Sequence, residues 1–167
     1  MRLFPAALAV AFAALSVSTS LHGQPADAPV DARSMALLAQ GRAAAAAGNL
    51  EAATDLIETA LAVDPRNRAA FIELASVAER QALPGKAIRL YREALLIEPN
   101  DPAALRGQGE ALVAKGALGP ARENLAKIRT LCGKKPCPDA VSLAASITKG
   151  PPPSATPTKV PETADAK

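Results

Sequence analysis

The residue types that could carry chemistry are few in this chain of 167 residues, and its two cysteines are the most suggestive. Cys132 and Cys137 flank the segment Gly-Lys-Lys-Pro, whose glycine and proline favour a turn. An even number of cysteines in an exported chain indicates a disulfide, so the sequence predicts that this pair is bonded. A thiol-redox role is the alternative, although the spacing is not C-x-x-C and no neighbouring histidine could activate a thiol.

Other catalytic arrangements lack their essential residues. The single histidine, His22, falls in an N-terminal segment that we expect to be removed, which leaves the mature chain without a serine–histidine or metal–histidine site. A structural zinc site needs four ligands, and the two cysteines supply only half of them. No glycine-rich phosphate-binding motif occurs. The sequence therefore predicts no enzyme activity, no metal site and no cofactor.

Residues 1–23 have the order of a secretory signal peptide. Arg2 precedes an apolar run from Leu3 to Val17, and small polar residues follow it. This run is shorter than the roughly 20 residues that a membrane-spanning helix needs. The segment predicts a cleaved leader, a periplasmic or secreted protein, and no stable membrane insertion after cleavage.

The composition favours closely packed helices in the remainder of the chain. Aromatic residues make up 2% and tryptophan is absent, so small side chains must fill the core. Basic and acidic residues nearly balance, with a formal net charge of +3, so the charge does not predict nucleic-acid binding.

The chain divides into three parts after the leader. Residues 24–33 are predicted to be a linker, and helical periodicity runs over 34–149. The proline-rich tail 150–167 is predicted to be disordered.

The most informative feature is an internal repeat. Its units begin at residues 34, 68 and 102, which makes the period 34 residues and the units 34–67, 68–101 and 102–135. Small residues recur at the eighth position of each unit and alanine at the twentieth, where they allow two helices to approach closely. These residues are Gly41, Ala75 and Gly109, and Ala53, Ala87 and Ala121.

Turn residues divide each unit into two helices. The turns fall at Gly48-Asn49, at Leu83-Pro84-Gly85 and at Gly116, while Pro65 and Pro99 follow the second helices of the first two units. A further amphipathic segment follows the third unit, and it predicts a capping helix. The predicted helices, with no strands, are 34–47, 50–63, 68–80, 84–97, 102–114, 118–131 and 138–149.

The repeat resembles the tetratricopeptide repeat (TPR) family. The second unit carries the closest match, in Phe71, Ala75, Ala87, Tyr91, Ala94 and Pro99. The third unit departs most, with Ile128 and Gly133 where the family favours alanine and proline. The resemblance implies an all-α fold, an α-solenoid of three TPR-like helical hairpins plus a C-terminal capping helix. It also implies a concave face, lined by the first helix of each hairpin, that holds a peptide or a partner helix.

Candidate binding residues follow from the positions that point inward in the family. The predicted set is Leu38, Arg42, Ile72, Ser76, Glu79, Arg80, Arg106, Glu110 and Val113. Some family members clamp a C-terminal carboxylate with lysine, asparagine and arginine. The matching positions here hold Leu38, Arg42, Glu73, Ala103 and Gly107, which cannot form that clamp. We therefore expect an amphipathic or extended ligand, with apolar contacts from Leu38, Ile72 and Val113 and polar anchors from the three arginines.

These observations predict a periplasmic protein–protein interaction module, an adaptor or assembly scaffold. Two alternatives stay open at this point. One is a thiol-redox accessory protein that uses Cys132 and Cys137. The other is a structural subunit of an envelope complex, whose groove is filled by its own tail or by a second copy. The partner is expected to be a protein, and the oligomeric state is open.

Overall fold

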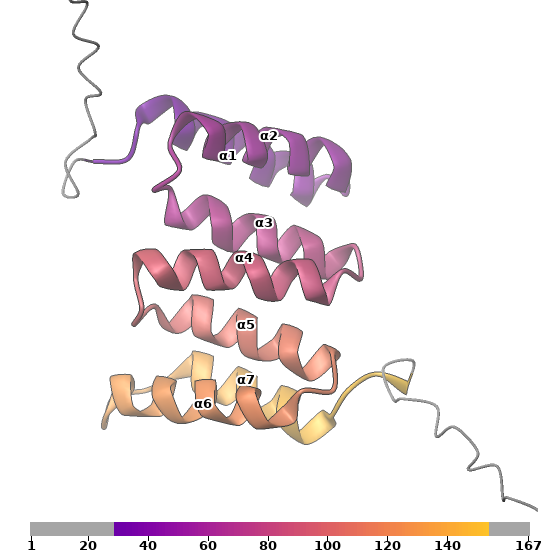
Figure 1. Cartoon of the computed structure of the whole chain (residues 1–167), viewed down its shortest axis with the longest axis vertical. Helices are drawn as coiled ribbons and strands as arrows, with labels where there is room; N and C mark the ends of the chain where they lie inside the picture. The colour runs from indigo at the N-terminus through magenta and orange to yellow at the C-terminus, as the bar shows by residue number, and fades with distance from the viewer. Residues whose placement is uncertain (1–28, 154–167) are drawn as a thin grey trace, which may run out of the picture.

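The structure is a computed structural model that describes residues 29–153, and it contains seven helices and no strand within that range. The helices succeed one another along a single array (Figure 1). No helix in this range is both long and apolar enough to cross a membrane. The helices are α1 (Ala32–Ala46), α2 (Leu50–Val63), α3 (Arg68–Arg80), α4 (Pro84–Ile97), α5 (Pro102–Ala114), α6 (Leu118–Cys132) and α7 (Pro138–Lys149).

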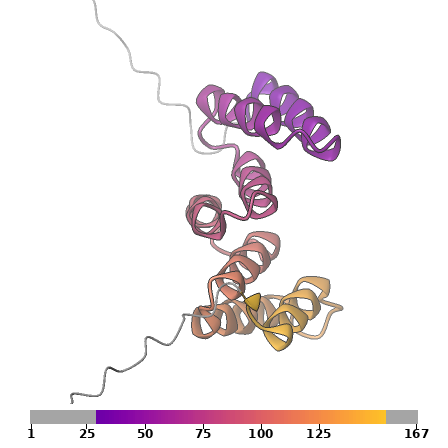
Figure 2. The same ribbon diagram turned by 90° about the vertical axis from the view of Figure 1, so that its right-hand side faces the viewer.

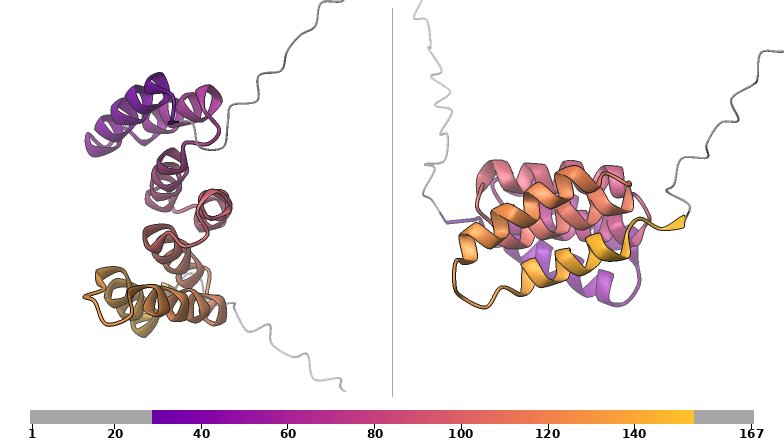
Figure 3. Two further views of the ribbon diagram at one scale, coloured as in Figure 1. Left: turned by 90° about the vertical axis from the view of Figure 1, so that its left-hand side faces the viewer. Right: turned by 90° about the horizontal axis from the view of Figure 1, so that it is seen from below.

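The helices form two layers that bend into an arc. Helices α1 and α2, α3 and α4, and α5 and α6 pair as hairpins, while α7 packs against both α5 and α6. Figure 2 and the left view of Figure 3 show α1, α3, α5 and α7 along the inner side of the arc and α2, α4 and α6 along the outer side. The right view of Figure 3 shows α6 and α7 side by side at the C-terminal end. The predicted all-α solenoid is therefore confirmed.

Local signals explain where these helices begin and end. The side chains of Asn49, Asn67 and Asp101 each accept a hydrogen bond from a backbone N–H in the first turn of the helix that follows. Helices α2 and α4 end before Asp64 and Glu98, whose extended conformations are those that a following proline imposes. Because these signals are local, the predicted bounds of α2, α3, α4, α5 and α7 agree with the structure.

The predicted bounds are wrong by one or two residues at α1 and α6. Helix α1 begins at Ala32 because Asp31 caps it and accepts a hydrogen bond of 2.7 Å from the backbone N–H of Arg33. The last two residues of the predicted linker are therefore helical. Helix α6 extends to Cys132 and ends at Gly133, which adopts a positive φ of 58°. The predicted leader and residues 154–167 of the predicted tail lie outside the described residues.

Small residues in the helices let the layers approach closely. An added Cβ at Gly41 would lie 2.5 Å from Ile57, and one at Gly109 would lie 2.6 Å from Leu143. The buried side chains form successive clusters between α1, α2 and α3, between α3, α4 and α5, and between α5, α6 and α7. The core is therefore a strip along the array, in which each hairpin depends on its neighbours.

Cys132 and Cys137 are joined by a disulfide, as the sequence predicted. The bond links the last residue of α6 to the residue that precedes α7. Both half-cystines are partly buried and pack against the cluster that contains Leu125, Ile128 and Leu143. This packing favours a structural role, in which the bond holds α7 against the third hairpin.

Candidate functional site

Ion pairs join consecutive helices along the inner face, which we define as the side of the arc formed by α1, α3, α5 and α7. Arg42 of α1 donates from Nε to Glu73 of α3 over 2.8 Å. Arg106 of α5 donates from Nε to Asp139 of α7 over 2.9 Å. These pairs hold neighbouring repeats together across the inner face.

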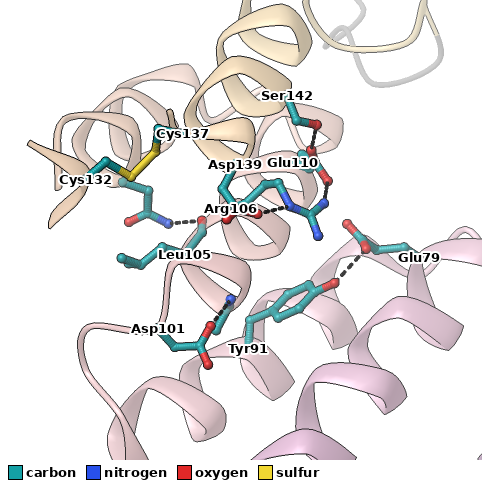
Figure 4. A network of polar contacts seen from close by, with 12 residues as sticks. Glu79, Tyr91, Asp101, Leu105, Arg106, Glu110, Cys132, Cys137, Asp139 and Ser142 are labelled. Carbon is teal, nitrogen blue, oxygen red and sulfur yellow. Dashed lines mark hydrogen bonds and ion pairs between the residues drawn. A yellow bond between two sulfur atoms is a disulfide. The ribbon is translucent and has the colours of Figure 1, made fainter. Parts of the chain in front are cut away.

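A polar cluster lies on this face, toward the C-terminal end of the array (Figure 4). Arg106 also donates from Nη1 to Glu110 over 2.9 Å, and Ser142 donates to the other oxygen of Glu110 over 2.8 Å. Figure 4 shows the Arg106 guanidinium between the carboxylates of Glu110 and Asp139, with Glu79 on its other side. The cluster therefore draws on α3, α5 and α7.

Glu79 lies beside this cluster, and no residue of the range 29–153 forms an ion pair with it. The Tyr91 hydroxyl, which reaches it from α4, donates a hydrogen bond of 2.9 Å to Glu79 Oε2. Burial raises the pKa of Glu79 to about 7, while the Tyr91 hydrogen bond acts to lower it, the Glu110 charge to raise it and the Arg106 charge to lower it. Burial and the Glu79 charge also raise the pKa of Tyr91 above its ordinary value. Glu79 is thus a carboxyl group that changes its charge near neutral pH.

A pocket of about 540 Å³ lies between the C-terminal halves of α5 and α7. Its lining is mostly apolar, and Glu110 and Lys149 add one charge of each sign. The lining residues are Glu110, Val113, Ala114, Ser146, Lys149, Gly150, Pro151, Pro152 and Pro153. Because Glu110 also belongs to the polar cluster, the pocket and the cluster form one continuous surface.

Comparison with known proteins identifies the fold. No protein-family model and no curated protein match the chain. The first TPR domain of Spaghetti (RPAP3), solved with the HSP90 peptide SRMEEVD, is 20% identical with a TM-score of 0.64, and the match covers 72% of this chain and 94% of that one. The structure has the tetratricopeptide-repeat fold.

Two bacterial proteins have the same TPR-like arrangement. The Yersinia enterocolitica type III secretion chaperone SycD, solved with a peptide of the translocator YopD, is 19% identical with a TM-score of 0.62. That match covers 69% of this chain and 92% of SycD. PcrH from Pseudomonas aeruginosa is 20% identical with a TM-score of 0.62, and the match covers 70% of this chain and 89% of PcrH. At these identities the similarity establishes the fold alone.

The predicted apolar contacts lie deeper in the TPR array than expected. Leu38 has no exposed surface, because α1 packs against both α2 and α3 and encloses it beside Ile57 and Leu74. Its prediction as a groove contact is therefore wrong. Ile72 is partly buried against the cluster of α3, α4 and α5. Val113 is only 4% exposed, and that surface lines the pocket between α5 and α7.

The predicted polar residues lie on the inner face, where several of them hold the array together. Arg42 and Arg106 form the ion pairs described above, and Arg80 donates from Nη1 to the Ala45 carbonyl oxygen at the end of α1 over 2.8 Å. Ser76 is half-buried on α3. The structure brings Glu79, Arg106 and Glu110 together in the polar cluster.

Sequence reasoning missed the contributions of α4 and α7 to this face. The sequence pattern used Tyr91 only as part of the repeat match, and it predicted only a cap where α7 lies. The Arg106–Asp139 pair spans 33 residues, about one repeat, so α7 occupies the place of the first helix of a fourth repeat. That spacing was the sequence signal that could have placed Asp139 on the inner face. Among residues 29–153, no group of three or more histidine, cysteine and acidic residues is arranged to hold a metal ion.

Proposed function

We propose that this chain is a protein-interaction module that binds a peptide segment or a partner helix along its inner face. The observation that carries the proposal is the pocket between α5 and α7, continuous with the polar cluster on the same face. A pocket with apolar walls and a few directed polar groups is the arrangement that anchors a side chain of a bound segment. SycD with its YopD peptide and Spaghetti with its HSP90 peptide support a peptide as the ligand.

The ligand is expected to differ from the acidic peptide bound by Spaghetti. The positions at which some TPR domains clamp a terminal carboxylate include Leu38, which is buried, and Glu73, which is acidic and paired with Arg42. An additional acidic group would face like charge at Glu73. An amphipathic segment with an apolar anchor for the pocket fits this surface better.

The proposal is tested by blocking the pocket. Peptides are selected from a random library on the purified full chain, and the affinities of the enriched peptides are then measured as synthetic peptides by fluorescence anisotropy. Ala114→Arg places a long charged side chain at the pocket from the last residue of α5. We expect it to weaken binding by at least about tenfold, the effect of losing one buried anchor.

Ala126→Arg is the matched control, because Ala126 is an exposed residue of α6 in the outer layer. It makes the same change of size and charge away from the inner face, and affinity should stay unchanged. Equal binding by both variants, or the absence of any enriched peptide, would contradict the proposed function.

We also propose that the chain works outside the cytoplasm. The Cys132–Cys137 disulfide supports export, because such bonds persist in oxidising compartments. Chain isolated from the envelope fraction is expected to have the mass of a bonded pair and an N-terminus near residues 20–23. Reduction should lower the free energy of unfolding by about 2 kcal/mol, as expected for so short a ring. Two readily alkylated thiols in unreduced material would argue against export.

A further inference from the structure

We infer that the partner segment presents a lysine or arginine to Glu79, next to an apolar side chain that enters the pocket between α5 and α7. This inference rests on the proposed function and adds the chemistry of the ligand.

The first line of argument is the pairing of the acidic groups on the inner face. Glu73 is paired with Arg42, and both Glu110 and Asp139 are paired with Arg106. Glu79 receives a hydrogen bond from Tyr91, and no cationic nitrogen among the described residues lies within 4.0 Å of its carboxylate. Glu79 is therefore an inner-face carboxylate whose counter-charge residues 29–153 do not supply.

The surroundings of Glu79 make a cation from outside favourable. Tyr91 reaches it from α4, while Arg106 and Glu110 face it from α5. Arg106 directs its hydrogen bonds to Asp139 and Glu110, so it acts on Glu79 only at longer range. Ionising a partly buried carboxyl group is unfavourable, and a cation that makes direct contact would offset that penalty.

The position of the pocket fixes the second feature of the ligand. Glu110 lines the pocket and also interacts with Glu79 through its charge, so both features lie on one stretch of the inner face. A segment with a basic residue close to an apolar residue can fill both places at once. An acidic segment without a basic residue would bring like charges to Glu79 and Glu110.

The experiment compares two charge-neutralising variants of the full chain. Glu79→Gln removes the unpaired carboxylate and keeps an amide oxygen for the Tyr91 hydroxyl. Glu93→Gln, at an exposed position of α4 in the outer layer, is the control. Thermal melts of both variants verify that the fold is retained.

We expect the peptides enriched on the unaltered chain to share a basic residue beside an apolar one. Their affinity should fall about five- to tenfold with Glu79→Gln, because a partly desolvated ion pair contributes more to binding than an exposed one. It should stay the same with Glu93→Gln, because Glu93 lies away from the inner face. Replacing the basic residue of the peptide with glutamine should cause a similar loss, and the two changes together should cost little more than either alone.

The pH dependence supplies an independent readout. With a pKa of about 7, Glu79 changes from roughly a tenth ionised at pH 6 to roughly nine tenths ionised at pH 8, while lysine and arginine stay charged. Basic peptides should therefore bind more tightly at pH 8 than at pH 6. Glu79→Gln should abolish this difference.

The possible outcomes separate the two proposals. Enriched peptides that lose affinity with Ala114→Arg but lack a basic residue, or that bind both glutamine variants equally, would overturn this inference and leave the proposed function standing. A pH-independent affinity for basic peptides would also overturn it. Peptides that Ala114→Arg does not weaken, or a failed selection, would reject the proposed function itself.

Discussion

Leu38→Ala is expected to lower the free energy of unfolding by about 2–5 kcal/mol, because it removes a fully buried side chain and leaves a cavity. Leu38 lies where α1, α2 and α3 meet, so neighbouring side chains cannot close the gap without moving a helix. Chemical denaturation followed by circular dichroism measures the change. The expected loss is a large share of the stability of a domain of this size.

Leu96→Ala is the matched control for this prediction. Leu96 lies in α4 and is 70% exposed, so the same truncation should change the unfolding free energy by no more than about 0.5 kcal/mol. Similar effects of the two substitutions would contradict the assignment of Leu38 to the core. A folded Leu38→Ala protein with weakened peptide binding and unchanged stability would show that Leu38 is a groove contact.

Gly107→Ala is expected to destabilise the protein by about 1–3 kcal/mol, although alanine is the better helix former. An added Cβ would lie 2.2 Å from Cζ and 2.5 Å from the hydroxyl oxygen of Tyr91. The ring is buried and hydrogen-bonded to Glu79, so it cannot move without losing contacts. The substitution should therefore loosen the contact between α4 and α5.

Gly119→Ala makes the same change where nothing lies within 4 Å of the new Cβ. This position is within α6, so alanine should stabilise the protein by up to about 1 kcal/mol. Thermal and chemical denaturation of both variants measure whether each substitution raises or lowers the free energy of unfolding. A neutral or stabilising Gly107→Ala would show that Tyr91 is not confined as the structure indicates.

The helices could be predicted from the sequence because their signals are local. Asn49, Asn67 and Asp101 cap the helices that follow them, and Pro65 and Pro99 stop those that precede them. Each of these effects acts within one turn of backbone and needs no knowledge of the fold. The 34-residue repeat then made it possible to predict the hairpins and their order.

The candidate site could be predicted only in part, because a position in a repeat gives the side of a helix and not what packs against it. Glu79 and Arg106 lie in the polar cluster of the inner face, whereas Leu38 is enclosed by α2 and α3. Tyr91, which binds Glu79, lies on α4, and Asp139, which binds Arg106, lies on α7. The predicted binding residues came only from the first helix of each hairpin, so neither residue was among them.

The sequence by itself determined the helical class and the number of hairpins, through capping and periodicity, and the even number of cysteines in a chain expected to be exported favoured a bond between them. The tertiary structure alone decided which carboxylates are paired and where the pocket opens. Within the described part of the chain Glu79 has no direct cationic partner, while Arg106 donates to Glu110 of its own helix and to Asp139 of α7, which is 33 residues away in the chain. The repeat spacing indicates only that Asp139 lies near Arg106; whether the two side chains meet depends on how α7 packs against α5, which the packing of whole helices sets.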